Sequence, residues 1–210
     1  MDAHEQIRTT KVVPVIALED AGRAEALGQA LVAGNLPIAE VTFRTAAAGE
    51  AIKVMAQNPD LLVGAGTVIN ADQVEQAVAA GAKFVVSPGF SPNVAERCAE
   101  HGIPLFPGVA SATEIIMALD AGVTTVKFFP ASTSGGAPAI KALSAPFPQV
   151  RFVPTGGIST DNLADYLAIP AVEACGGSWM VPAKAIAAGD FATVTQLASD
   201  AVALAASLRS

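Results

Sequence analysis

The chain has 210 residues, of which 52% are hydrophobic and 15% are charged, and its net charge is −7. This composition excludes a disordered chain, and the lack of any run of about 20 apolar residues predicts no membrane-spanning helix. The negative charge argues against a nucleic-acid-binding surface, although a local site can still bind an anionic small molecule.

The N-terminal segment and the cysteines indicate the cellular compartment. Residues 1–11 mix charges of both signs and lack the apolar core of a signal peptide. Cys98 and Cys175 are the only cysteines, and their separation does not fit a metal site. Because free thiols are ordinary in the cytosol, we expect a soluble cytoplasmic protein with no membrane or nucleic-acid partner.

Short β-branched runs alternate with alanine-rich amphipathic segments along the chain. The expected strands, in chain order, are Val12–Leu18, Ile38–Phe43, Leu62–Val68, Phe84–Ser87, Leu105–Val109, Thr125–Phe129, Arg151–Thr155 and Ala171–Cys175. Their starts lie about 23 residues apart on average, which suits one strand followed by one helix. Most of them are apolar at nearly every position, as expected for parallel strands covered on both faces.

The intervening segments carry helix start and stop signals. Ser111 and Glu114 have the spacing of a capping box, and Ser91 followed by Pro92 fits an N-cap and first helical residue. Left-handed glycines that end helices are expected at Gly34, Gly81, Gly102 and Gly122. The last helix is expected to bury a face made of Val194, Leu197, Ala198, Ala201, Val202, Ala205 and Leu208.

Eight strand–helix units predict an α/β fold, a small single-domain (β/α)8 TIM barrel over residues 1–210 with residues 1–11 as an N-terminal segment. The alternative is a doubly wound open sheet, but no glycine-rich dinucleotide turn follows the first strand. Pro14 fits the barrel poorly, because it removes a ladder hydrogen bond and a closed barrel has no free edge. We place Pro14 near the start of its strand and retain the barrel.

Active sites of such barrels lie at the C-terminal ends of the strands, so polar residues in or just after strands are candidates. These residues are Glu40, Thr42, Arg44, Thr67, Ser87, Lys127, Thr155, Gly156, Gly157, Gly176, Gly177 and Ser178. Arg151 opens the seventh expected strand, and we therefore place it at the opposite, structural end.

Lys127 stands alone in an apolar strand, between Val126 and Phe128. Burial removes water from an ammonium group and favours the neutral amine. A neutral amine in an apolar pocket is what Schiff-base formation with a ketone requires. The alternative is a structural lysine whose amine reaches the rim or pairs with a carboxylate.

Glu40, Thr42 and Arg44 alternate with apolar residues, so the period of two points all three toward the same side of their strand. Glu40 and Arg44 could form a buried ion pair without a catalytic role. They could also supply a general base and an anion-binding group, and a reactive lysine on another strand favours this second interpretation.

Glycine pairs follow the seventh and eighth expected strands, Gly156–Gly157 and Gly176–Gly177. Many barrels bind phosphate at these two neighbouring positions through backbone N–H groups, and Ser178 adds a hydroxyl. One pair alone could be only a tight turn, whereas two on neighbouring strands favour a phosphate site.

Histidine and carboxylate positions argue against metal chemistry. His4 lies in the N-terminal segment, and His101 lies at a helix end beside Gly102. Neither can build a histidine-based triad or a zinc site. Glu173 could face the barrel interior, but no second carboxylate at a strand end accompanies it. We therefore expect no bound metal.

Six motifs together resemble those of the 2-keto-3-deoxy-6-phosphogluconate aldolases. In chain order they are Glu40–Thr45 (EVTFRT), Gly64–Thr67 (GAGT), Ser87–Gly89 (SPG), Lys127–Pro130 (KFFP), Pro154–Ile158 (PTGGI) and Gly176–Trp179 (GGSW). The resemblance runs from about Val12 to the last helix. It implies a class I aldolase, a lyase on a (β/α)8 barrel, which assembles as a homotrimer and uses no metal or organic cofactor.

The resemblance also implies the reaction. Such enzymes cleave 2-dehydro-3-deoxy-6-phosphogluconate to pyruvate and glyceraldehyde 3-phosphate in the Entner–Doudoroff pathway. Some members also cleave 4-hydroxy-2-oxoglutarate to pyruvate and glyoxylate. The expected partner is thus a small phosphorylated 2-oxo acid.

Roles follow by matching motifs. The resemblance implies that Lys127 forms the Schiff base and Glu40 is the acid/base, while Arg44 and Thr67 bind the pyruvyl end. It places Gly156, Gly157 and Ser178 at the phosphate. Further residues expected to contact substrate are Ser87, Pro88, Phe129, Thr155 and Gly177. Two departures are Phe43, where leucine is more usual, and Ser132, where glutamate often follows Phe-Phe-Pro-Ala.

Other functions stay open at this stage. An aldolase for the galactonate epimer is one alternative, because the sequence does not define the configuration at C4. A sugar-phosphate isomerase or epimerase would share the phosphate loops but usually needs two facing acid/base groups, and only Glu40 is a clear candidate. A catalytically silent metabolite-binding barrel would use Lys127 only in an ion pair.

Overall fold

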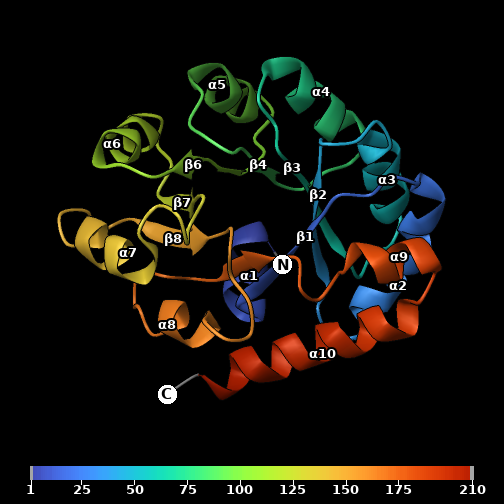
Figure 1. The fold of residues 1–210 in the computed structure, drawn as a ribbon. Helices are drawn as coiled ribbons and strands as arrows, with labels where there is room; N and C mark the ends of the chain where they lie inside the picture. The colour runs from blue at the N-terminus through green and yellow to red at the C-terminus, as the bar shows by residue number, and fades with distance from the viewer. Residues whose placement is uncertain (1, 209–210) are drawn as a thin grey trace.

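The computed structural model describes residues 2–208, and strands alternate with helices along the chain (Figure 1). The strands are β1 (Val12–Ile16), β2 (Ile38–Thr42), β3 (Leu62–Gly66), β4 (Val85–Val86), β5 (Leu105–Phe106), β6 (Gly108–Val109), β7 (Thr125–Phe128), β8 (Arg151–Pro154) and β9 (Cys175–Gly177). All the pairings between these strands are parallel.

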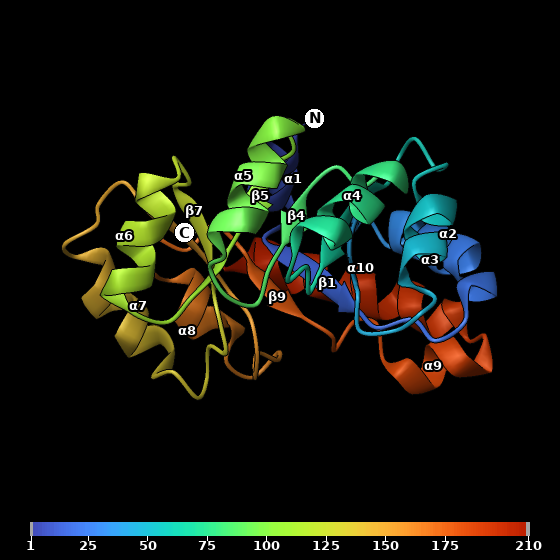
Figure 2. The ribbon, with the colours of Figure 1, turned by 90° about the horizontal axis from the view of Figure 1, so that it is seen from above.

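Helices alternate with the strands, and all of them except α1 form an outer ring around the barrel (Figure 1). They are α1 (Ala3–Thr10), the short 3₁₀ helix η1 (Ala21–Arg23), α2 (Ala24–Ala33), α3 (Ala48–Met55), α4 (Ala71–Ala79), α5 (Pro92–Glu100), α6 (Ala112–Asp120), α7 (Gly136–Ser144), α8 (Leu163–Leu167), α9 (Ala183–Ala188) and α10 (Phe191–Ser207). The last of them, α10, runs along the outside of the barrel and packs against α2 and α9 (Figure 2).

The strands close into a ring. Six of them pair in the order β5-β4-β3-β2-β1-β9, and three pair in the order β6-β7-β8. Only Pro107 separates β5 from β6, so these two strands are halves of the fifth predicted strand. Two parallel bridges, Phe152↔Val172 and Thr155↔Gly176, join β8 to the segment of β9. The predicted (β/α)8 barrel is confirmed, and the open doubly wound sheet is wrong.

The last strand is displaced from its predicted position. The expected range was Ala171–Cys175, whereas β9 begins at Cys175, where it pairs with Val12 of β1. The β-branched Val172 makes only an isolated bridge. Pairing with β1 therefore sets the strand, and Gly177, which was expected in a loop, lies within it.

Pro14 is the third residue of β1, and the two neighbours of that strand explain how it is tolerated. Pairing with β9 covers Val12 to Pro14, whereas pairing with β2 begins only at Val15, opposite Glu40. The ladder to β2 therefore starts just beyond the residue that lacks an N–H group.

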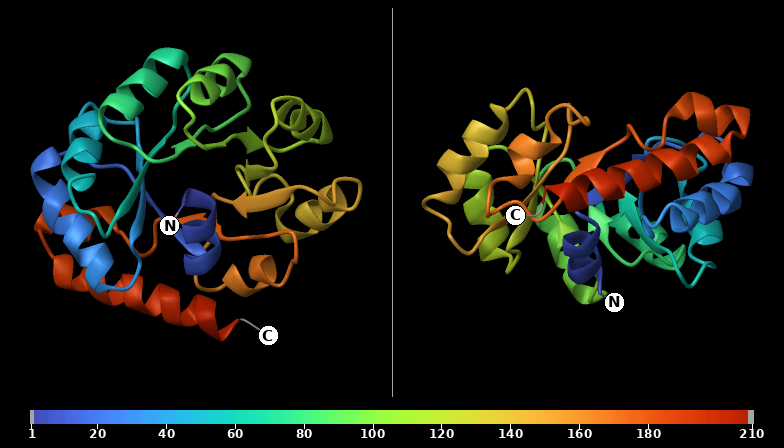
Figure 3. Two further views of the ribbon diagram at one scale, coloured as in Figure 1. Left: turned by 180° about the vertical axis from the view of Figure 1, so that it is seen from behind. Right: turned by 90° about the horizontal axis from the view of Figure 1, so that it is seen from below.

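Helix α1 was not predicted, and it closes the N-terminal end of the barrel. Asp2 caps it by accepting a 2.8 Å hydrogen bond from the Glu5 N–H group, and Ile7 is buried. The His4 ring lies 4.9 Å from the Phe106 ring. Seen from behind, α1 lies over the middle of the ring (Figure 3, left). The opposite end, where the strands finish, carries the candidate site residues.

Most of the predicted helix signals are present in the structure. Ser91 and Ser111 cap α5 and α6, and the buried side of α10 follows the predicted stripe. The left-handed glycines are confirmed at Gly81, Gly102 and Gly122. The prediction for Gly34 is wrong, because its φ is −82° and the left-handed residue is the following Asn35.

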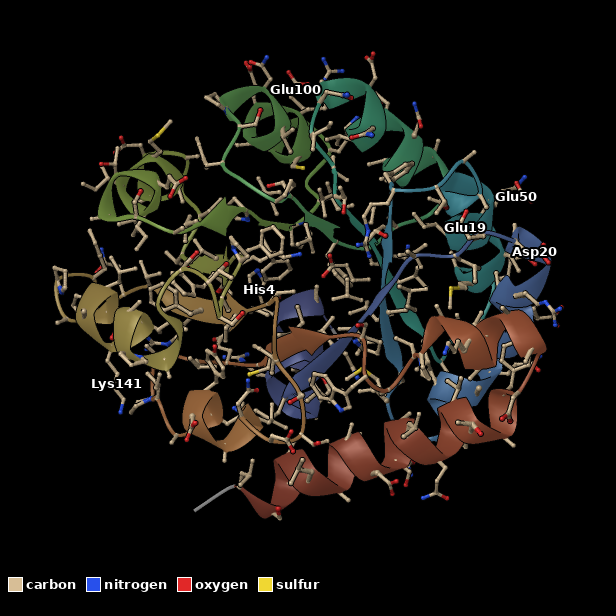
Figure 4. The ribbon with its side chains drawn as sticks, in the orientation of Figure 1. His4, Glu19, Asp20, Glu50, Glu100 and Lys141 are labelled. Atoms are coloured by element: carbon tan, nitrogen blue, oxygen red, sulfur yellow. The ribbon has the colours of Figure 1, made fainter. Side chains whose placement is uncertain are left out.

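Charged side chains lie mainly on the outside of the barrel. Figure 4 shows Glu50, Glu100 and Lys141 pointing away from the ring, whereas His4 lies near its centre. Across residues 2–208, no helix combines the length and the apolar character needed to cross a membrane.

Candidate active site

Lys127 and Glu40 meet inside the barrel. The Lys127 Nζ atom lies 3.1 Å from Glu40 Oε1, and the two side chains are 7% and 4% exposed. Lys127 lies on β7 between Gly108 and Val153 of its neighbours, and Glu40 lies on β2. A buried amine thus has a carboxylate within proton-transfer distance, the geometry that general acid–base chemistry requires.

The glycine at position 66 makes room for the Glu40 carboxylate. Gly66 ends β3, the neighbour of β2, and a Cβ atom there would clash with Glu40 Oε1 and lie 2.7 Å from Glu40 Cγ. Any larger residue at position 66 would displace the carboxylate. This explains the second glycine of the Gly64–Thr67 motif by close approach rather than by a turn.

Phe129 covers the amine from the chain that leaves β7. The Lys127 Nζ atom lies 5.1 Å from the centre of the Phe129 ring, within the range of a cation–π contact. Phe129 is half-buried. The ring therefore reduces the contact of the amine with water.

Arg44 and Glu40 do not form the ion pair that the sequence left open. Glu40 pairs with Lys127 instead, and the Arg44 Nε atom donates a 3.0 Å hydrogen bond to Thr42 Oγ1. No carboxylate in residues 2–208 forms a salt bridge with Arg44, whose side chain is exposed. Its guanidinium is thus available to an anion.

Thr67 adopts a left-handed backbone conformation, with φ of 57°. That region is unfavourable for a β-branched residue, and such strain clusters at functional sites. The preceding residue, Gly66, lies opposite Thr42 in the ladder between β2 and β3. Thr67 therefore lies at the same end of the barrel as Arg44.

The Ser87 side chain stabilises the loop that follows β4. Its buried hydroxyl donates a 2.7 Å hydrogen bond to the carbonyl oxygen of Gly89, across Pro88. The hydroxyl proton is therefore used within the Ser-Pro-Gly motif. Its remaining lone pairs can only accept a hydrogen bond.

The loop after β8 is held through its carbonyl groups. The Ala131 and Ser132 N–H groups donate to the carbonyl oxygens of Thr155 and Gly156, at 2.8 and 3.0 Å. The Asn162 side chain donates to the carbonyl oxygen of Gly157 at 2.9 Å. No acceptor among the described residues binds the N–H groups of Gly156 or Gly157. These donors are free for an anion, as the phosphate prediction requires.

Gly157 combines a left-handed φ of 74° with a close approach to Ser132, because an added Cβ atom would clash with the Ser132 Oγ atom. Ser132 is the residue that stands where the resembling family often has glutamate. The structure therefore places it against the backbone of the candidate phosphate loop.

The second glycine pair differs from the first. Gly177 is the last residue of β9, and the Trp179 ring fills the space that a Cβ atom at this position would take. Ser178 is the first residue beyond the strand and is exposed. Among the residues described, nothing accepts a hydrogen bond from the Ser178 N–H group.

Sequence reasoning missed Asn162 as a residue that shapes the site, and it gave Thr42 and Ser132 no contact partner. The alternation in β2 pointed Thr42 to the correct side but gave it no partner. Asn162 immediately precedes α8, a position where a capping role could have been suspected. For Ser132, no sequence signal indicates the contact with Gly157.

Other chemistry-bearing groups lie elsewhere. The His101 Nε2 atom lies 3.0 Å from Glu75 on the surface. Within residues 2–208, no group of three His, Cys, Asp or Glu side chains is arranged to hold a metal ion. Cys98 and Cys175 are buried free thiols, and burial raises the pKa of both, that of Cys98 to about 11.

Comparisons with known proteins agree on one family. A family model described as KDPG and KHG aldolase matches residues 3–197. The 2-dehydro-3-deoxy-phosphogluconate aldolase of Treponema pallidum is 55% identical over 194 residues, 92% of each chain. The KHG/KDPG aldolase of Escherichia coli (strain K12) is 46% identical over 200 residues, 94% of each chain.

Solved structures show the same similarity. The 2-keto-3-deoxy-6-phosphogluconate aldolase of Zymomonas mobilis ZM4 with 3-phosphoglycerate is 44% identical, with a TM-score of 0.90 over 95% of this chain and 94% of that one. The KDPG aldolase of Legionella pneumophila, with pyruvate captured as a covalent carbinolamine, is 41% identical, with a TM-score of 0.91 over 95% and 98%. The sequence motifs, the closed barrel and these matches together show that this chain belongs to the KDPG and KHG aldolase family.

Proposed function

We propose that this protein is a class I aldolase that cleaves 2-dehydro-3-deoxy-6-phosphogluconate to pyruvate and glyceraldehyde 3-phosphate, the aldol cleavage of the Entner–Doudoroff pathway. The observation that carries the proposal is the buried Lys127–Glu40 pair at 3.1 Å. Relatives between 44% and 55% identical are named for this activity. The carbinolamine in the Legionella pneumophila protein is the covalent species that precedes an imine.

The reaction begins at Lys127. Glu40 accepts a proton from the ammonium group, and the neutral amine attacks the C2 ketone of the substrate. Glu40 returns this proton to the carbinolamine hydroxyl, which leaves as water to give a protonated imine, and Glu40 is again a carboxylate. The Phe129 ring beside Nζ limits competing contact with solvent.

Glu40 then acts as the base, directly or through one water molecule. It removes the C4 hydroxyl proton, the C3–C4 bond breaks, and the electron pair moves into the imine to form an enamine. Glyceraldehyde 3-phosphate leaves as the aldehyde. Protonation of the enamine at C3 and hydrolysis of the imine release pyruvate and restore Lys127.

Arg44 and Thr67 bind the carboxylate at the pyruvyl end. The support is that Arg44 has no carboxylate partner within the described chain and that Thr67 lies at the same barrel end. A fixed carboxylate holds the adjacent ketone carbon near the amine, which is an orientation effect rather than a proton transfer.

The loop after β8 and Ser178 bind the phosphate. The free N–H groups of Gly156, Gly157 and Ser178 support this assignment, together with the bound 3-phosphoglycerate in the Zymomonas mobilis relative. Ser87, Pro88, Thr155 and Gly177 complete the walls of the substrate site. Gly177 lies in β9, so it forms part of the wall of the site and is not a loop residue whose N–H group binds the phosphate.

A second activity, the cleavage of 4-hydroxy-2-oxoglutarate to pyruvate and glyoxylate, is favoured by the family description and by the name of the Escherichia coli relative. The same amine, base and carboxylate site serve both substrates. Glyoxylate carries no phosphate, so this reaction does not need the loop after β8.

We also propose that the protein is a cytoplasmic homotrimer. The free thiols of Cys98 and Cys175 support a reducing compartment. Ile116 and Met117 of α6 are 50% and 38% exposed, and Met117 lines an apolar groove with Phe90. Such a surface suits contact with other copies. Light scattering should give about three times the 21.1 kDa chain mass, and a single-chain mass would contradict the trimer.

The proposed activity is tested by measuring pyruvate release from each substrate, with the galactonate epimer in the same panel. The parent protein should release pyruvate from the gluconate compound, and Lys127→Ala should release none. A chelator should leave the rate unchanged. Faster turnover of the galactonate epimer would show that this epimer, and not the gluconate compound, is the preferred substrate. Metal-dependent turnover would contradict the class I mechanism.

A further inference from the structure

The Thr42 hydroxyl joins Arg44 to a neighbouring strand. Thr42 ends β2 and is 1% exposed. Its Oγ1 atom donates a 2.8 Å hydrogen bond to the carbonyl oxygen of Ile16, the last residue of β1. The same atom accepts a 3.0 Å hydrogen bond from Arg44 Nε.

The direction of both bonds is fixed by chemistry. A carbonyl oxygen can only accept and an arginine N–H group can only donate, whereas a hydroxyl offers one proton and two lone pairs. The proton of Thr42 is therefore used by Ile16, and a lone pair faces Arg44. A buried hydroxyl with both functions satisfied is a rigid anchor, because rotating it would break a bond that burial makes costly.

The bond to Nε leaves a defined part of the guanidinium free. Arginine presents its five N–H donors in a planar fork, and one of them is used by Thr42. The terminal nitrogens remain available, and two parallel bonds to a carboxylate require the plane of the group to be set. The Arg44 side chain is exposed. If nothing anchored it in the free protein, it would lose rotamer freedom when the carboxylate binds, and this loss would weaken binding.

We propose that Thr42 is a positioning residue that holds the Arg44 guanidinium in the orientation that receives the carboxylate of the 2-oxo acid. This inference rests on the proposed function, in which Arg44 binds that carboxylate. Thr42 itself touches no substrate atom. Its effect is on affinity for the pyruvyl end and passes through Arg44.

The chain offers a matched control three residues away. The Thr45 Oγ1 atom donates a 2.6 Å hydrogen bond to the carbonyl oxygen of Leu18, so it ties the same segment to the chain after β1. No bond joins Thr45 to Arg44 in the described chain. Thr45→Val therefore removes a comparable anchor of the backbone and leaves the guanidinium untouched.

The test measures the pyruvate concentration at half-maximal imine trapping with borohydride, together with kcat and KM for cleavage. Thr42→Val keeps the shape and should raise the half-saturating concentration and KM about tenfold, the size of one orienting bond to a charged group, with kcat within about twofold. Thr42→Ser keeps the hydroxyl and should restore parental values. Thr45→Val should match the parent.

A double variant separates positioning from folding. In an Arg44→Ala background, Thr42→Val should cause no further loss, because the group that it positions is gone. An equal loss in both backgrounds would show a structural role and overturn the proposal. A parental KM in Thr42→Val, or a Thr42→Ser variant as weak as Thr42→Val, would overturn it as well.

A failure of the proposed function and a failure of the positioning role of Thr42 give different results. If the parent traps no pyruvate, the proposed function is wrong and this role falls with it. If the parent traps pyruvate and the Thr42 variants do not differ from it, only the positioning role is wrong.

Discussion

Glu40 and Lys127 come from opposite sides of the barrel, and their side chains meet at 3.1 Å in its interior. β1, β9 and β8 separate β2 from β7 on one side, and β3 to β6 separate them on the other. Local chain geometry cannot bring these residues together. Closure of the ring creates the pair, so the fold and the proposed chemistry are coupled at this contact.

Glu40→Gln tests the proposed role of Glu40 as the base separately from the proposed role of Lys127 as the electrophile. The amide keeps the shape of the side chain but cannot carry the proton. We expect turnover to fall by roughly 10²–10⁴, the usual contribution of general acid–base catalysis, while pyruvate can still be trapped on Lys127. Steady-state cleavage and borohydride trapping measure the two effects. Turnover within a few-fold of the parent would make Glu40 a structural partner of Lys127.

Thr67→Gly should make the protein more stable and weaken its affinity for pyruvate. Glycine adopts a φ of 57° without the strain that a β-branched residue suffers, so the free energy of unfolding should rise by about 1 kcal/mol. Loss of the side chain should raise KM for pyruvate in the condensation direction several-fold. Denaturant unfolding and steady-state kinetics measure the two quantities.

Thr160→Gly is the control for that substitution. Thr160 is exposed and has no left-handed φ, so glycine there should not stabilise the protein. A Thr67→Gly variant less stable than the parent would show that the strain at Thr67 is offset by its contacts.

The proposed phosphate loop after β8 should distinguish phosphorylated from unphosphorylated substrates. Hydrogen bonds to a charged group are worth about 1.5–3 kcal/mol each, so 2-keto-3-deoxygluconate without phosphate should have a kcat/KM at least roughly 10²-fold lower. Gly157→Ala should narrow this gap, because its Cβ would clash with Ser132 at a left-handed position. Cleavage of 4-hydroxy-2-oxoglutarate should stay unchanged.

Gly49→Ala is the matched control, since a Cβ atom there meets nothing within 4 Å. It should leave both substrates unaffected. Equal efficiency of the parent on the phosphorylated and unphosphorylated compounds would show that the paired glycines are only turns.

The cysteines should be inert in the folded protein. Burial raises the pKa of Cys98 to about 11, so at pH 8 roughly one thiol in a thousand is the reactive thiolate, and burial also raises the pKa of Cys175. A thiol reagent should label neither residue in the native protein and both in denaturant. Rapid labelling of either native thiol would contradict the buried positions.

Much of the barrel and the centre of the site could be predicted from the sequence. Lys127 and Glu40 are charged residues in apolar strands, and only a site or an ion pair explains such positions. The roles of Ser132 and Asn162 could not be predicted, because they depend on contacts between loops rather than on local patterns. Helix α1 was missed because its eight residues are mostly polar, and packing against the barrel end supports them.

Trapping of the imine tests the proposed role of Lys127 most directly. The parent protein is incubated with pyruvate, reduced with borohydride, digested and mapped by mass spectrometry. Lys127 is the lysine that the structure buries beside a carboxylate in the barrel, whereas Lys53 and Lys141 are exposed. We expect one reduced pyruvyl adduct per chain, on Lys127. No adduct, or an adduct on Lys53 or Lys141, would contradict that role.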